Sequence, residues 1–449
     1  MGIQVNFVGL LVRGLLLLVF LTVVTLFINL PWFDEPLHPD LTTLGTPRSV
    51  SMEDNSFPLI HGFAAASNKN PLAVGNAIIE NLRDRYQLGE RVTLSHEEMD
   101  ELLGGSELDE EWRSIFQTLG CNSRLSVDCA GRLIAEIENI DLDQPRIGLL
   151  LERYEEILQA SRFAENEEFD AYTPLPRYGL LMQVARLRLA ISYQRDTGTE
   201  FLYKVDEDIK FWRSMLSNGQ SLIAKMVALA GFRNDLEFLS ALLRLRELSN
   251  SEIESVRGLL RPLSSDEQDI GASFLTELRI LMLSDSSLAV MLSNNSWAAR
   301  TFFQKRATLN EYYLTAIMPL RLRASLSAEE FYRQRGHEKL SYDVRAFPPP
   351  LYNLGGKLAL KQMAAEQSLQ DYISRVHDVD GRVLLLLLQA EIEQNPQRGV
   401  EAIVSSSVHR NPYTGEPMKH DVSARTIGFD CLTEEQGDVC SVAIGEIRF

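Results

Sequence analysis

Histidine and aspartate side chains around residues 337 and 378 have the types and order that could support metal chemistry. His337 lies upstream of the pair His377-Asp378, and further aspartates follow. Such side chains can hold a pair of metal ions that activates water for hydrolysis, provided that they converge. A structural role is the alternative, because His377, Asp378 and Asp380 precede Gly381 as a loop between two helices would. We therefore predict no metal site, with His337, His377 and Asp378 as its candidates if one exists.

The four cysteines form two close pairs, Cys121 with Cys129 and Cys431 with Cys440. Neither pair has the C-x-x-C spacing or the histidine partners of a zinc site. An even number of cysteines in local pairs is typical of proteins in oxidising compartments. We predict two disulfides, and a loop of about eight residues closed in this way stabilises a fold by roughly 2–3 kcal/mol.

Other familiar catalytic patterns are absent from the sequence. It contains no G-x-S-x-G, S-x-x-K, Walker A or dinucleotide-binding glycine motif, and His96 and His337 lack the second histidine of H-E-x-x-H. One dense turn motif, Asn411-Pro412-Tyr413-Thr414-Gly415, has no evident chemical role. We predict no catalytic residues and no cofactor.

The N-terminal segment predicts where the rest of the chain is located. Residues 7–30 contain one charge, Arg13, and as a helix they reach about 36 Å, enough for a hydrocarbon core of about 30 Å. No small-residue cleavage site follows, so the segment is expected to be an uncleaved anchor. Because Asp34 and Glu35 lie on its far side, the positive-inside rule places residues 1–6 in the cytoplasm. Together with the cysteine pairs, this predicts a single-pass inner-membrane protein whose bulk lies in the periplasm.

The composition excludes some partners. The whole chain carries 44 Lys and Arg against 62 Asp and Glu, and only Arg13 among them precedes Pro31. A body this acidic is not expected to bind nucleic acid, which requires clustered positive charge. It is also not expected to lie flat on an anionic membrane surface.

Amphipathic helices dominate the chain from about residue 71 onwards. Apolar residues step by three or four from Leu180 to Ile191 and again from Phe201 to Met215, and only a few polar residues separate such stretches. Short connections make neighbouring helices antiparallel. We expect a break between two helices at Gly231–Asp235. Because no repeat period holds, we predict a mainly α fold, either an irregular α-solenoid or layered helical hairpins.

The C-terminal part has a different character. Pro348-Pro349-Pro350 marks a boundary, and helices are expected to resume near Gly356 and again after Asp380. Apolar residues then alternate on both sides of residues 432–439, which predicts a small β-hairpin closed by Cys431–Cys440. The predicted divisions are a cytoplasmic N-terminus (1–6), an anchor (7–30), a tether (31–58), a helical body (59–347), C-terminal helices (348–408) and a β cap (409–449).

Several short motifs together resemble a group of single-pass periplasmic proteins of Gram-negative bacteria that has no established activity. The motifs are Asp54-Asn55, His61-Gly62-Phe63, Asn70-Pro71 with Gly75, Cys121 with Cys129, Glu152-Arg153-Tyr154, Phe211-Trp212-Arg213, Lys225-Met226, His377-Asp378-Val379-Asp380 and the 411–415 turn. The resemblance implies the same location and a single-family architecture. It also offers an alternative interpretation of His377-Asp378, as a structural motif of that group and not a metal site.

These observations leave three functional hypotheses. The first is a non-enzymatic interaction or scaffold protein that meets a protein partner in the envelope, since stacked helices offer grooves for helices or peptides. The second is a hydrolase acting on envelope material through residues that sequence spacing does not reveal. The third is an assembly factor or sensor that acts partly through its anchor.

Overall fold

The computed structural model describes residues 7–42, 44, 54–88, 92–105, 128–165, 173–283, 302–335, 352–366, 369–433 and 440–445. The described chain is mainly helical, with an apolar N-terminal helix and a small antiparallel sheet near a C-terminal disulfide, which confirms the predicted fold class. It divides into two compact units built from non-contiguous stretches. Unit 1 takes in Met1–Thr46, Leu278–Pro319 and Glu338–Ser368, and unit 2 takes in Pro47–Glu277, Leu320–His337 and Leu369–Phe449.

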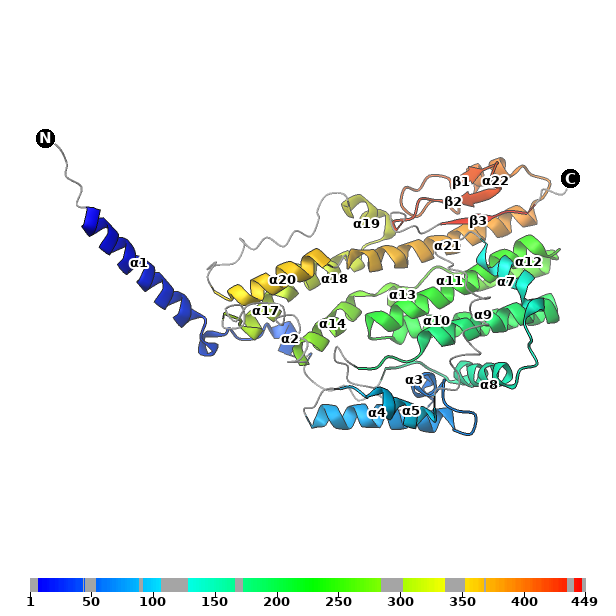
Figure 1. The fold of residues 1–449 in the computed structure, drawn as a ribbon. Coiled ribbons are helices and arrows are strands. Elements are labelled where there is room, and N and C mark those ends of the chain that lie inside the picture. The colour runs from blue at the N-terminus through cyan, green and yellow to red at the C-terminus, as the bar shows by residue number, and fades with distance from the viewer. Residues whose placement is uncertain are drawn as a thin grey trace. The chain divides into compact units, whose positions relative to one another are not determined.

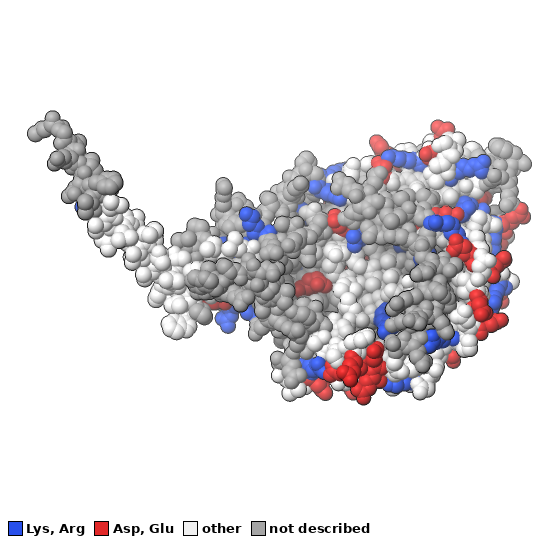
Figure 2. All heavy atoms as spheres, viewed as in Figure 1, with Lys and Arg blue, Asp and Glu red and all other residues white. Residues whose placement is uncertain are grey.

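Unit 1 contains the apolar N-terminal helix and the short elements that receive its end. Its elements are α1 (Phe7–Ile28), η1 (Pro31–Phe33), α2 (Pro39–Thr42), α17 (Lys305–Tyr312), the π-helical turn η3 (Tyr313–Ile317) and α20 (Leu354–Glu366). Within α1, Leu11–Ile28 is long and apolar enough to cross a membrane, and none of it is buried. Figure 2 shows this helix almost without charged side chains, whereas side chains of both signs of charge gather on the right and lower parts of the visible face of the body.

Residues 31–42, which the sequence places in a tether, are packed against α17. The Asp34 carboxylate accepts hydrogen bonds from the backbone N–H groups of Arg306 and Ala307, at 2.9 and 3.0 Å, and so caps the start of α17. Further along, the Tyr313 hydroxyl donates to Asp40 Oδ2 at 2.6 Å. The chain that leaves α1 is therefore part of a folded unit.

Unit 2 is a layered set of helical hairpins that carries the sheet. Its helices are α3 (Ser56–His61), α4 (Pro71–Gln87), α5 (His96–Leu103), α7 (Cys129–Glu136), η2 (Ile137–Asn139), α8 (Pro145–Gln159), α9 (Tyr178–Arg195), α10 (Gly198–Asn218), α11 (Leu222–Leu245), α12 (Asn250–Leu259), α13 (Ser265–Gln268), α19 (Ala328–Arg335), α21 (Gln370–Gln394) and α22 (Val400–Ser406). Two more helices, α14 (Gly271–Leu283) and α18 (Met318–Ala324), contribute residues to both units. In Figure 1, α9, α10 and α11 lie side by side, and α21 packs on α11.

The predicted amphipathic faces form the core of unit 2. The stripe from Phe201 to Met215 on α10 is buried at each of its predicted positions, and Leu180, Val184 and Leu187 on α9 are buried as well. The α9–α10 connection is short because Thr197 begins α10 directly, in a capping box with Glu200. These helices therefore form antiparallel neighbours, as their short connections predict.

Two predicted breaks in helices are wrong. Helix α11 continues through Gly231–Asp235. Glycine is needed at position 231 because a Cβ there would lie 2.3 Å from ring atoms of Trp212 on α10. Helix α21 continues through residues 377–381, so His377 and Asp378 are not in a loop between helices. At Gly381 a Cβ would lie 2.6 Å from Phe429 Cζ. Both glycines permit close packing and do not end their helices.

The sheet forms a small cap on α21. Its strands β1 (Lys419–Asp421), β2 (Thr426–Gly428) and β3 (Ser441–Ala443) pair antiparallel in the order β1-β2-β3. Just beyond the β2–β3 pairing, Cys431 and Cys440 form the predicted disulfide, with Cα atoms 5.5 Å apart. Cys129 is disulfide-bonded too, while its predicted partner Cys121 lies outside the described residues.

Candidate functional site

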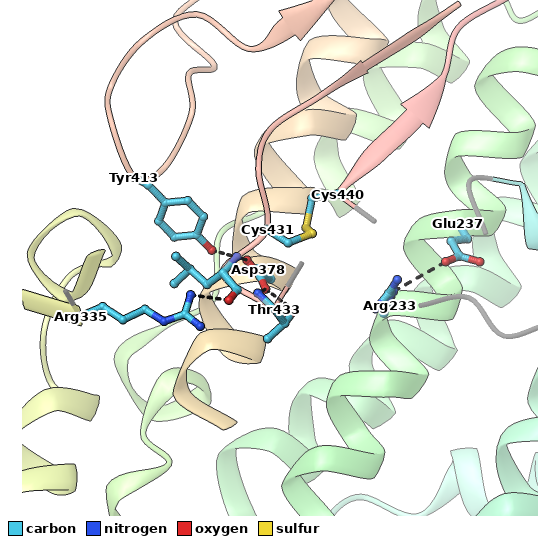
Figure 3. Close-up of a disulfide and its surroundings, with 9 residues drawn as sticks. Arg233, Glu237, Arg335, Asp378, Tyr413, Cys431, Thr433 and Cys440 are labelled. Atoms are coloured by element: carbon cyan, nitrogen blue, oxygen red, sulfur yellow. Dashed lines mark hydrogen bonds and ion pairs between the residues drawn. A yellow bond between two sulfur atoms is a disulfide. The ribbon is translucent and has the colours of Figure 1, made fainter. Parts of the chain in front are cut away.

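Asp378, in the first half of α21, lies beside three of the residues singled out in the sequence, Tyr413, Cys431 and Cys440. Its side chain is 5 % exposed, and Oδ1 accepts hydrogen bonds from the Tyr413 hydroxyl at 2.5 Å and from Leu432 N at 2.8 Å. Oδ2 accepts from Thr433 N at 3.1 Å and from the Thr433 hydroxyl at 2.7 Å. Figure 3 shows these groups pointing at one carboxylate beside the disulfide. Asp378 thus joins the helix to the turn motif and to the cap.

The 411–415 turn is shaped to deliver Tyr413 to that carboxylate. The Asn411 side chain accepts from Tyr413 N at 2.9 Å, and the Asn411 carbonyl accepts from Gly415 N at 2.9 Å. Gly415 has a φ of 69°, which glycine adopts without strain. Tyr413 is 3 % exposed, and Tyr332 of α19 stacks on it with ring centroids 5.7 Å apart. The turn motif therefore has a structural role, which the sequence alone did not indicate.

The disulfide completes this centre without offering a metal site. Ligand atoms of Asp378, Cys431 and Cys440 lie within 4.8 Å of one another, the one such triad of His, Cys, Asp or Glu in the described part of the chain. Both sulfur atoms are bonded to each other, however, so neither is a thiolate that could bind a metal. The carboxylate, for its part, already accepts four hydrogen bonds from protein groups.

His377 does not join Asp378 in a metal site. Its ring faces Phe331 of α19, with centroids 5.2 Å apart, and it is 3 % exposed. Burial lowers the pKa of His377 to about 4, so the ring is neutral at physiological pH. His337, the third candidate ligand, lies outside the described residues. The two described candidates hold different neighbours of α21: His377 packs on α19, and Asp378 binds the cap.

Asp380 uses a further side of the same helix turn. Its Oδ1 accepts from Leu263 N at 2.7 Å, and its Oδ2 accepts from Gln268 Nε2 at 3.1 Å, which fastens α13 and the residue before its N-cap to α21. Burial raises the pKa of Asp380, while the bond from Leu263 opposes that shift. The segment 377–381 therefore connects α21 to three separate parts of unit 2.

We expect the buried His377 ring to make unit 2 less stable in acid. Its folded pKa lies below its ordinary value of 6.5, so the unfolded chain binds the proton more tightly and stability falls as pH drops below 6.5. Between pH 7 and pH 5 this difference amounts to about 2 kcal/mol. Asp208 and Glu237, whose pKa values burial raises to about 7, act in the opposite direction.

A comparison with His377→Gln isolates this contribution. Urea unfolding at a series of pH values should show the variant losing about 2 kcal/mol less than the wild type between pH 7 and pH 5. Contributions from Asp208 and Glu237 occur in both proteins and cancel in the difference. Parallel pH profiles for the two proteins would show that His377 is not buried in its neutral form.

A small cavity of about 160 Å³ lies next to the Asp378 centre, between α11, α21 and the cap. Arg233, Arg375 and Arg382 line it together with apolar residues of α11. Arg233 Nε lies 3.7 Å from Glu237 Oε1, and the charges of Arg382 and Arg233 partly offset the burial that raises the pKa of Glu237 to about 7. The Asp378 carboxylate also lines the cavity, so its wall combines both signs of charge with apolar side chains.

Sequence reasoning missed a buried carboxylate pair in the helical core. Asp208 of α10 and Asp235 of α11 are 0 % and 1 % exposed. Tyr154 donates to Asp208 at 2.9 Å, and Arg188 lies 3.4 Å from it while also binding Glu155. Burial raises the pKa of Asp208 to about 7, and burial also raises the pKa of Asp235 well above its ordinary value, with the Asp208 charge adding to that second shift. In the sequence, the position of Asp208 beside the apolar stripe of α10 was the one indication of a buried carboxylate.

No protein-family model, curated protein or solved structure matches this chain. The roles of its motifs therefore follow from its own contacts, and these are consistently structural. Arg153 donates to the backbone carbonyls of Phe63, Ala65, Ala66 and Lys69 and so fixes the loop between α3 and α4. Arg213 binds Glu267 at 2.8 Å, and the Lys225 ammonium binds two backbone carbonyls.

Proposed function

We propose that this protein is a membrane-anchored interaction protein of the bacterial envelope, without catalytic activity of its own. In this proposal α1 crosses the inner membrane, and both the remainder of unit 1 and unit 2 stand in the periplasm. The observation that carries it is that the side chains most capable of chemistry make structural contacts. Asp378, Tyr413, Cys431 and Cys440 all hold the cap or fasten it to α21.

The location rests on α1 and on the disulfides. Leu11–Ile28 is apolar enough to cross a membrane, and Cys431–Cys440 and Cys129 are disulfide-bonded, as expected in an oxidising space. The negative net charge of the chain, −18, favours protein partners over nucleic acid. Layered helices offer a broad surface on which a partner protein can bind.

Site-specific photo-crosslinking in living Gram-negative cells tests the proposal. A benzoylphenylalanine residue would replace, one at a time, exposed side chains of unit 2, beginning with Leu88, Val408 and Val422, which are 73 %, 84 % and 73 % exposed. We expect discrete adducts of one protein from neighbouring positions on one face. The unsubstituted chain under the same illumination is the control. Illumination of a full set of exposed positions without any protein adduct would contradict the interaction role.

The same cells test the location. If free thiols are blocked before lysis, Cys431 and Cys440 should remain unmodified and should react only after reduction. Modification without a reductant would show that the body is not in an oxidising compartment. That result would contradict the periplasmic location and leave the test for a partner intact.

A further inference from the structure

The end of α1 is built into unit 1 by a buried polar junction. Asn29 is 3 % exposed, and its side-chain oxygen accepts a hydrogen bond from Asn353 N at 2.9 Å. Gln304 Nε2 donates to the backbone carbonyls of Asn29 and Leu30, at 2.6 and 3.0 Å. The Asn353 side chain in turn accepts from Gln304 N at 2.9 Å and from the Thr308 hydroxyl at 3.1 Å. The starts of α17 and α20 are thereby fastened to the last residues of the anchor.

A second contact fixes the chain just beyond this junction. The Tyr352 hydroxyl donates to the Phe33 carbonyl at 3.0 Å and accepts from Glu35 N at 3.3 Å. Residues 352 and 353, immediately before α20, are therefore both bonded to residues that directly follow α1. The first turn of α20 must therefore lie close to the C-terminal end of α1, at a similar height along the α1 axis.

Unit 1 exposes apolar side chains at this level. On α20, Leu354 and Leu358 are 36 % and 50 % exposed, and Lys361 follows on the same face, whereas the described residues of the other faces are buried. Beside the end of α1, Leu30, Trp32 and Phe33 are also exposed, with Trp32 at 87 %. We call these residues together the α20 face, although three of them belong to the segment that follows α1. The set is Leu30, Trp32, Phe33, Leu354, Leu358 and Lys361.

We propose that the α20 face is immersed in the headgroup region of the outer leaflet of the membrane that α1 crosses. This inference rests on the proposed function, because it requires α1 to span the bilayer. A helix of 22 residues is about 33 Å long and ends at the hydrocarbon boundary. Tryptophan and amphipathic helices with exposed leucine and lysine side chains favour this interfacial region.

The charges around the α20 face are compatible with contact to lipid headgroups. Asp34 caps the start of α17, and Glu35 accepts a hydrogen bond from Asn310 Nδ2 at 2.9 Å, so both carboxylates are engaged by unit 1 itself. Arg306 and Lys361 are exposed. Their cationic ends can reach lipid phosphates while the leucine side chains contact the acyl chains.

Photo-crosslinking of the full-length protein in phosphatidylcholine nanodiscs tests this proposal. Benzoylphenylalanine is placed at Leu358, at Leu21 within α1, or at Tyr203 of α10, which are 50 %, 45 % and 64 % exposed. Leu21 reports whether α1 is in the bilayer, and Tyr203 is the exposed control on unit 2. We expect phospholipid adducts at Leu21 and at Leu358, both several-fold above Tyr203, from variants that unfold at the wild-type temperature.

The outcomes separate this inference from the proposed function. Lipid adducts at Leu21 with only the Tyr203 level at Leu358 would overturn the α20 face and leave the anchor intact. A protein adduct at Leu358, from a second copy of the chain, would also overturn it, because the face would then be a contact between copies. Absence of lipid adducts at both positions would contradict the membrane-spanning role of α1 itself.

Discussion

Asp378→Asn should destabilise unit 2 by about 2–6 kcal/mol and loosen the cap from α21. The amide would replace one carboxylate oxygen with an NH₂ group that faces either the two donors of Thr433 or those of Tyr413 and Leu432. Two buried donors would then lose their acceptor, and each such loss costs about 1–3 kcal/mol. Urea unfolding of the full-length protein in detergent measures the change.

The disulfide provides a second measure of the same variant. When the cap loosens, Cys431–Cys440 should become accessible, so its reduction by dithiothreitol should be faster in Asp378→Asn than in the wild type. Asp430→Asn is the matched control in the same cap, because Asp430 is 62 % exposed and its ion pair with Lys419 is a surface one. Such pairs contribute about 1 kcal/mol or less. Equal stability of the two variants would refute the role of Asp378 as the residue that fastens the cap.

The sequence was sufficient to predict the class of fold and the C-terminal disulfide, because both follow from local patterns. The apolar stripe of α10 and the C-terminal hairpin depend on the spacing of residues that are close in sequence. The Cys431–Cys440 disulfide follows from a short loop in the same way. What local patterns could not predict were contacts between distant segments, such as Tyr413 with Asp378.

Local patterns were also insufficient to decide whether His377 and Asp378 share a metal site. His377 and Asp378 are neighbours in sequence, but a helix directs successive side chains about 100° apart, so one meets α19 and the other the cap. Whether they converge with other metal ligands depends on tertiary structure, which sequence spacing does not reveal. Likewise, no spacing indicated that the first residues of the predicted tether would be bound by α17 and Tyr352.

Glycine residues were the least reliable indicators of helix ends, because Gly231 and Gly381 lie inside helices where they permit close packing. Gly231→Ala tests this packing role. In an exposed helix, alanine in place of glycine stabilises by about 0.5–1 kcal/mol. At Gly231 the new Cβ would lie 2.3 Å from two ring atoms of Trp212, which is fully buried. We expect a loss of about 3 kcal/mol, at the upper end of the usual cost of overpacking a core. Chemical unfolding of the variant beside the wild type measures it.

Gly148→Ala is the matched control for this substitution. Gly148 lies on α8, and a Cβ added there would meet no atom within 4 Å, so its replacement should stabilise unit 2 by about 0.5–1 kcal/mol. The two substitutions are chemically identical and should differ in sign. If Gly231→Ala also stabilised the protein, α10 and α11 could not be packed as closely as the structure places them.

A double-mutant cycle separates the contact itself from a general intolerance of α11 to substitution. Trp212→Phe removes part of the ring system that faces Gly231, and by itself it should destabilise unit 2 by creating a cavity. In that background the cost of Gly231→Ala should shrink, because the added methyl group then occupies space that the smaller ring has vacated. Strictly additive effects would instead mean that the two residues do not touch. The close approach of α10 and α11 at Gly231 would then not exist, although α11 would still be continuous through this residue.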